Sequence, residues 1–117
     1  LPRRVADFLK KEAKVEIGAL GEKPAKTVKR PVKSIRYKDT VSRWGSCSSE
    51  GNLSFSWRIM MAPRPVIDYL VAHEVAHLVH GDHSPRFWAV VAQLVGDPAP
   101  HRAWLRQHGA GLHALTF

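Results

Sequence analysis

The feature that most constrains the fold is the segment from Val66 to His80, in which only Asp68 and Glu74 carry a charge. A helix that is apolar nearly all round is buried, so this segment predicts a helix at the centre of its domain. Two prolines just before it are typical of a helix start, and Gly81 is its predicted end. A chain of 117 residues allows one modest core around such a helix.

The flanking segments predict an α+β fold with a small antiparallel sheet. The alternation of apolar and polar residues over 33–41 and 53–57 predicts two strands, which we expect to form an antiparallel hairpin with a long connection. Helical spacing predicts an N-terminal helix over residues 3–20 that stops at Gly18 or Gly21, followed by a basic loop over 22–32. Two further helices are expected, from Ser84-Pro85 to Gly96 and from Pro100 to Gly109.

The formal charge of +8 is a property of one region of the chain. Residues 1–43 hold 13 Lys and Arg against 5 Asp and Glu, whereas residues 44–117 hold 5 of each. A basic segment can bind nucleic acid, but a solvated, solubilising surface is the favoured interpretation of this segment. The charge therefore allows nucleic acid as a partner, but we do not favour that interpretation.

The cysteine content and the hydropathy pattern bound the compartment. Cys47 is the single cysteine, so no disulfide can form within the chain, and a reducing, cytoplasmic location is expected. The longest apolar runs are too short to cross a bilayer, so no membrane partner is expected. The first residue is Leu1 rather than Met, which leaves open whether the chain is a fragment of a longer one. The oligomeric state is also left open.

The predicted central helix contains His73-Glu74-Val75-Ala76-His77, a pattern typical of zinc hydrolases. Histidines at i and i+4 lie on one helical face, so both rings can reach one ion. Glu74 lies about 100° round the helix from His73, where its carboxylate can take a proton from a metal-activated water. The alternative is two packed, hydrogen-bonded core histidines with a surface Glu. The apolar surroundings favour the metal site, because a buried His or Glu is costly unless it is paired or metal-bound.

A catalytic zinc site needs a third protein ligand, and two histidines follow the motif. His80 lies two turns from His73, so binding the same ion would strain both side chains. His83 follows Gly81, where the helix can end and the chain can turn back. We therefore favour His73, His77 and His83 as ligands of Zn²⁺, with His80 outside the ligand set.

Three segments resemble the YgjP-like, SprT-like group of zinc metallopeptidases. They are Arg43-Trp-Gly-Ser-Cys-Ser48, then the run from Ile59 to Leu70, then His73 to Trp88. The resemblance extends from about residue 35 to 109. It implies a minimal zincin-like domain in which His73, His77 and His83 bind zinc and Glu74 is the catalytic base.

The chain departs from this group in two places. Relatives commonly carry a longer β-rich N-terminal region, and they usually have Asn where Asp82 stands. The spacing of the three histidines also matches metzincins, but those have Gly at the position of His80 and a methionine turn downstream. Both methionines of this chain, Met60 and Met61, are upstream, which excludes that assignment.

The sequence therefore predicts a single domain over 1–117, with a basic helix and loop over 1–32 and a catalytic core over 33–117. The favoured function is a zinc-dependent metallopeptidase that acts on a peptide or protein substrate with a metal-activated water. The strand from Leu53 to Trp57 is expected to offer an edge to an extended peptide. The alternatives are a zinc-dependent hydrolase of a nucleotide phosphate and a zinc-stabilised nucleic-acid-binding module.

Overall fold

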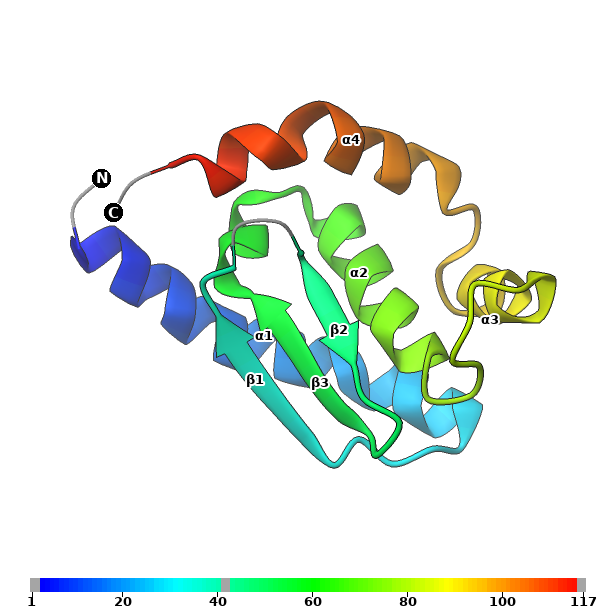
Figure 1. Cartoon of the computed structure of the whole chain (residues 1–117). Coiled ribbons are helices and arrows are strands. Elements are labelled where there is room, and N and C mark those ends of the chain that lie inside the picture. Colours follow the sequence, from blue (N-terminus) through cyan, green and yellow to red (C-terminus); the bar gives the residue numbers. More distant parts are fainter. Residues whose placement is uncertain (1–2, 41–42, 116–117) are drawn as a thin grey trace.

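The computed structural model describes residues 3–40 and 43–115, and its fold is α+β as predicted. Within the described residues, three strands form one sheet, four α-helices lie behind it and to its side but not over the face turned to the viewer in Figure 1, and a short 3₁₀ helix, η1, follows the third strand. In chain order the elements are α1 (Arg3–Val28), β1 (Ser34–Lys38), β2 (Gly45–Cys47), β3 (Asn52–Ser56), η1 (Trp57–Met61), α2 (Arg64–Ala76), α3 (Pro85–Val95) and α4 (Ala99–His113). No helix of the described residues is long and apolar enough to span a membrane.

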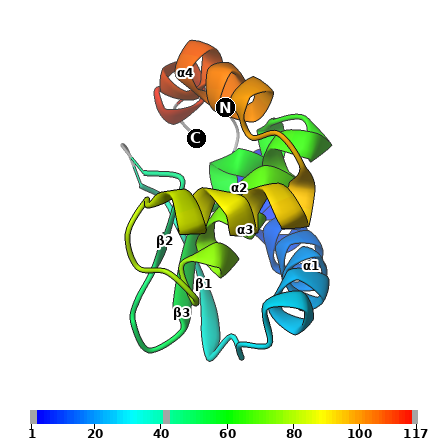
Figure 2. The ribbon, with the colours of Figure 1, turned by 90° about the vertical axis from the view of Figure 1, so that its right-hand side faces the viewer.

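Helix α2 is the central element, as its apolar sequence predicts. Nine of its thirteen residues are buried, and it contacts α1, α3, α4 and β2 (Figure 2). It ends at Ala76, earlier than Gly81, because the backbone then tightens into a 3₁₀-like turn. In this turn the amide of His77 donates to the carbonyl of Glu74 at 3.2 Å, and the amide of Leu78 donates to Val75 at 2.9 Å. The tightening leaves His77 on the last turn of the helix.

Helix α1 is longer than the sequence predicts. The loop expected over 22–32 is wrong for residues 22–28, which are helical. The helix continues to Val28 with Pro24 inside it. Its buried side includes the expected stop, because Gly21 lies against α2, where an added methyl group would be 3.9 Å from Val71. Beyond that point Val28 packs against the core. Packing against α2 thus outweighs the local tendency of glycine and proline to end a helix.

The sheet is mixed, so the predicted antiparallel hairpin between residues 33–41 and 53–57 is wrong. The strand order is β1-β3-β2, with β1 parallel to β3 and β2 antiparallel to it. The hairpin joins β2 and β3 through a turn at Ser48–Gly51, where Gly51 has a positive φ of 94°. Alternation identifies a strand but not its partner, and the short β2 lies in a run of small polar residues typical of turns. Val41, the last residue of the predicted first strand, lies outside the described residues.

The two C-terminal helices begin where the sequence predicts. Ser84 caps α3 by accepting a hydrogen bond from the amide of Phe87 at 3.4 Å, and Gly96 ends that helix. Helix α4 does not stop at Gly109 as expected. That residue is buried within the helix against Trp44, where an added methyl group would lie 3.1 Å from the indole nitrogen. Gly109 therefore allows close packing of α4 and does not cap it.

A buried arginine fastens the end of α4 to the segment after β1. Arg58, only 7% exposed, places Nε 2.7 Å from Oδ1 of Asp39. Its Nη1 donates to the carbonyl of Leu112 at 3.0 Å and also to the carbonyl of Leu115. The last carbonyls of a helix have few partners within the helix, so this guanidinium adds charged hydrogen bonds at the end of α4.

We predict that Arg58→Ala lowers the free energy of unfolding by about 2–3 kcal/mol, because the charged hydrogen bonds of a buried guanidinium and its ion pair with Asp39 are lost. Denaturant unfolding measures the loss. The matched control is Arg64→Ala, which removes exposed ion pairs to Glu16 and Asp68 and should cost less than about 1 kcal/mol. An equal cost for both variants would contradict the anchoring role of Arg58.

Candidate metal centre

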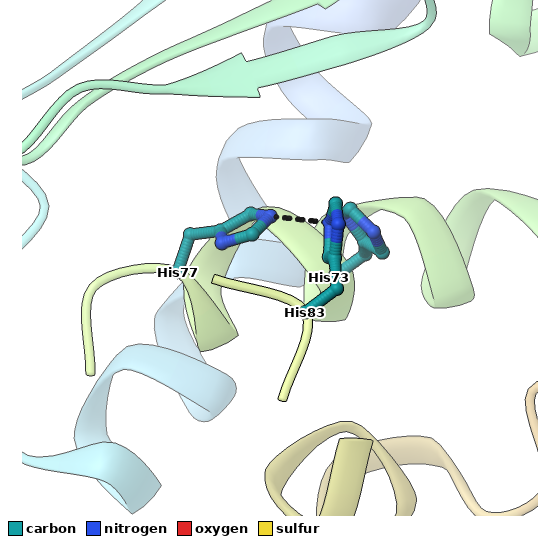
Figure 3. Close-up of side chains that lie close together, drawn as sticks. All are labelled: His73, His77 and His83. Atoms are coloured by element: carbon teal, nitrogen blue, oxygen red, sulfur yellow. Dashed lines mark hydrogen bonds between the residues drawn. The ribbon is translucent and has the colours of Figure 1, made fainter. Parts of the chain in front are cut away.

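Three histidines converge at the C-terminal end of α2. His73 and His77 come from the helix, and His83 comes from the loop before α3 (Figure 3). One ring nitrogen of each lies within 4.8 Å of the others. The Nε2 atoms of His77 and His83 are 3.1 Å apart. The ligand atoms of a tetrahedral zinc site are about 3.3 Å apart, so this cluster has the dimensions of a metal site.

The partner of His77 selects the nitrogen that is free for a metal. Its Nδ1 lies 3.1 Å from the carbonyl oxygen of His80. A carbonyl oxygen only accepts hydrogen bonds, so Nδ1 carries the proton and Nε2 keeps its lone pair. That Nε2 is the atom that faces His83, as the dashed line in Figure 3 shows. His80 therefore contributes through its backbone, and its side chain is not part of the cluster.

Aromatic rings from α3 pack against the three histidines. Phe87 is fully buried, stacks on His77 at 4.4 Å between ring centroids and meets His73 edge-on at 5.1 Å. Trp88 stacks on His83 at 5.9 Å. These contacts restrict the imidazole orientations, so α3 holds the third histidine in place against the two on α2.

Electrostatics favour the neutral form of His83. Its pKa is lowered by removal from water and by the positive charge that His73, His77 and Arg102 would place beside it. A neutral imidazole is the form that binds a metal ion.

Glu74 lies beside the cluster, under the first strand residue of β2. It is 3% exposed, and its Oε2 is 3.1 Å from Nδ1 of His73. An added methyl group at Gly45 would lie 2.9 Å from that oxygen and 3.0 Å from Cγ of the same side chain. A side chain at this position would push the carboxylate aside, so the close approach of the strand backbone sets its position.

The cluster opens into a cavity of about 740 Å³. Its walls come from α2, from the loop with His83 and from the segment between Arg43 and Ser49. Cys47 is part of this wall, and burial, together with the charge of Glu74, raises the pKa of its thiol to about 11. A thiol that stays protonated at neutral pH is a poor nucleophile, so Cys47 is a packed wall residue in this setting.

Three other polar residues of the chain differ in where they lie relative to the histidines. Tyr69 lines the cavity and meets His73 edge-on at 5.8 Å, so it is both a core residue and a wall residue. Asp68 lies 3.4 Å from Arg64, and Asp97 accepts a hydrogen bond from the amide of Ala99. The structure places neither aspartate against the three histidines.

Sequence reasoning from the residues alone missed Gly45 and Phe87 as parts of the site. The signal for Gly45 was its place in the Trp-Gly-Ser-Cys run, but nothing in that run says which side chain it would meet. Phe87 is a buried apolar residue of α3, and its contact with the histidines depends on how α3 packs on α2.

The residues present fit a metal ion of the zinc type. Three imidazoles converge, the hydrogen bond of His77 leaves Nε2 available, and a buried carboxylate lies beside them. Three nitrogen ligands leave a fourth coordination position for a reactant, which is typical of catalytic and not structural zinc sites.

Comparisons with known proteins agree with this chemistry. The family model described as "YgjP-like, metallopeptidase domain" matches residues 1–108. Among solved structures, the metallopeptidase zymogen of Pyrococcus abyssi abylysin has a similar fold, with a TM-score of 0.66 and 18% sequence identity. The match covers 80% of this chain and 92% of that one, so the two share a small zincin-like fold. A search of curated proteins found no match.

We predict that His83→Ala weakens the binding of Zn²⁺ more than about 100-fold. Removing a residue that only orients a metal ligand already costs about 10–100-fold in affinity, and this substitution removes the ligand itself. His80→Ala is the matched control. It should keep the metal, because the backbone carbonyl that orients His77 remains. Titration with a competing chelator measures both affinities. Equal loss in the two variants, or none in either, would contradict this ligand set.

Proposed function

The chain belongs to the YgjP-like metallopeptidase family, and we propose that it is a zinc-dependent peptidase that hydrolyses peptide bonds with Glu74 as its general base. In this proposal His73, His77 and His83 hold the metal. The observation that carries it is the meeting of these three histidines with the buried carboxylate of Glu74 in one open cavity.

Each group of the chain has a defined task in this reaction. Zinc, when bound, supplies Lewis acidity that makes water a nucleophile near neutral pH and polarises the scissile carbonyl. The Glu74 carboxylate accepts a proton from the attacking water and returns it to the leaving amine nitrogen. The close contact with Gly45 keeps that carboxylate facing the histidines. Tyr69 lines the cavity one turn before His73, within reach of a bound substrate.

An extended peptide would bind along β2. The strand expected to offer an edge, Leu53–Trp57, does not do so, because β3 has a neighbour on each side. Within the described chain β2 pairs with β3 alone, and its residues Gly45, Ser46 and Cys47 line the cavity. A peptide that forms backbone hydrogen bonds with this edge of β2 would have a peptide bond beside Glu74, whatever its side chains.

The remaining expectations from the sequence stay proposals. A peptide or protein substrate, a reducing cytoplasmic location and the single domain over 1–117 all belong to this account. The extensive packing of α1, in which Ala13 and Ile17 are fully buried, supports one core shared by the basic N-terminal part and the rest.

We predict that Glu74→Gln abolishes peptide hydrolysis, with kcat falling at least about 10²–10⁴-fold, while one zinc per chain is retained. The amide keeps the shape of the carboxylate but cannot accept the proton. Zinc content and turnover of a peptide library by the purified, zinc-loaded protein measure the two effects. Full turnover by the variant would contradict the role of Glu74.

A panel of nucleotide phosphates in the same assay separates the proposal from its closest alternative. Hydrolysis of peptides without hydrolysis of nucleotides is expected. The reverse pattern, also abolished by Glu74→Gln, would identify the site as a zinc-dependent phosphate hydrolase.

We further predict that Gly45→Ala lowers kcat about 10–100-fold with little change in KM or in zinc content. The added methyl group displaces the Glu74 carboxylate by part of an ångström, and small misplacements of catalytic groups are costly. Gly18→Ala is the matched control, because a methyl group there has no neighbour within 4 Å. A normal kcat for Gly45→Ala would show that the carboxylate tolerates the shift.

A further inference from the structure

The face of the sheet opposite α1 carries basic and hydroxyl side chains. Leu53 and Phe55 point into the core, so the intervening residues point the other way. On that outer face the register places Arg36, Ser54 and Ser46 in one row across the three strands. Figure 1 looks onto this face, with α1 behind the sheet. We define the outer face by Arg36, Lys38, Arg43, Ser46 and Ser54.

The positive charge of the outer face is not neutralised by the described part of the chain. Arg36, Lys38 and Arg43 are exposed, and none of them is in an ion pair with a described residue. Asp39 is close in sequence, but its carboxylate lies against Arg58 at 2.7 Å. Three cations therefore remain available to an outside anion.

Two shallow hollows give the outer face the shape of a binding surface. They have volumes of about 310 and 170 Å³, and their described lining residues include no carboxylate. Lys38, Ser46 and Ser54 line both of them. Ammonium groups and hydroxyls together supply the charge and the hydrogen-bond donors that a carboxylate needs.

The hollows border the cavity of the metal centre across β2. Ser46 lines the cavity and both hollows, while Arg43 and Gly45 line the cavity and the smaller hollow. A ligand on the outer face is therefore separated from Glu74 only by the three residues of β2. In a peptide paired with β2, alternate side chains would fall on the outer side, next to Ser46.

We propose that the outer face binds acidic side chains of the substrate, so that the enzyme prefers peptides with Asp or Glu next to the scissile bond. This inference rests on the proposed peptidase function and names its substrate class. The position of the hollows across β2 from the cavity favours a peptide over a nucleic acid, because a peptide paired with β2 would turn alternate side chains toward the hollows while its backbone lies at the cavity. The basic charge of residues 1–43 then acts through the three cations that line the hollows.

The test compares two charge-reversed variants of equal net charge. Arg36→Glu/Lys38→Glu alters the outer face, and Lys11→Glu/Lys14→Glu alters exposed positions on α1. The substrates are a peptide pool with Glu at fixed positions around a randomised centre and the same pool with Gln in place of Glu. The zinc-loaded wild type should cleave the Glu pool about three- to tenfold faster at 50 mM salt, the size expected for one or two exposed ion pairs. This preference should weaken at 500 mM salt.

The control variant should keep the preference, and the outer-face variant should lose it. A preference that survives Arg36→Glu/Lys38→Glu, or equal cleavage of both pools by the wild type, would overturn the inference while leaving the peptidase function intact. Loss of cleavage of the Glu pool with unchanged cleavage of the Gln pool would support it.

A binding measurement separates this inference from failure of the proposed function. Fluorescence anisotropy of labelled Glu and Gln peptides on zinc-loaded Glu74→Gln protein needs no turnover. Tighter binding of the Glu peptide, lost on reversal of Arg36 and Lys38, supports an acidic-peptide surface even if no pool is cleaved, in which case the peptidase function fails. Equal binding of both peptides, with binding of single-stranded DNA that the same reversal abolishes, would overturn the inference in favour of nucleic acid.

Discussion

The burial of α2 is the constraint on which the rest of the structure depends. A helix with nine buried residues among thirteen needs neighbours on nearly every side, and α1, α3, α4 and β2 supply them. The same packing brings β2 so close that a side chain at position 45 would displace the carboxylate of Glu74. One packing arrangement therefore buries the carboxylate, places two histidines beside it at the end of the same helix, and puts the edge strand β2 in the wall of the cavity.

The sequence predicts the elements of the fold better than their ends and partners. The apolar run around His73 leaves no other place for α2 than the centre, and Ser84 and Pro85 mark the start of α3 correctly. Local signals failed where tertiary packing overrides them. Pro24 does not break α1, because the helix packs on α2, and β2 is hidden in a run typical of turns.

The candidate site follows the same division. Helical spacing alone places His73, His77 and Glu74 together, and the chain reversal after Gly81 brings His83 to them. Neither Phe87 beneath the rings nor Gly45 against the carboxylate could be placed, because each contact joins elements distant in sequence. The sequence shows that the first 43 residues are basic but not where their charges lie. The fold of the sheet brings Arg36, Lys38 and Arg43 together on its outer face.

We propose that the imidazoles of His73, His77 and His83 hold a zinc ion and leave its fourth coordination position open for the reactant. X-ray absorption at the zinc edge of the loaded protein tests it most directly. The account predicts three histidine nitrogens and one further light atom at about 2.0–2.1 Å, with no sulfur. A sulfur neighbour at about 2.3 Å, which Cys47 alone could supply in the cavity wall, or fewer than three histidines would contradict it.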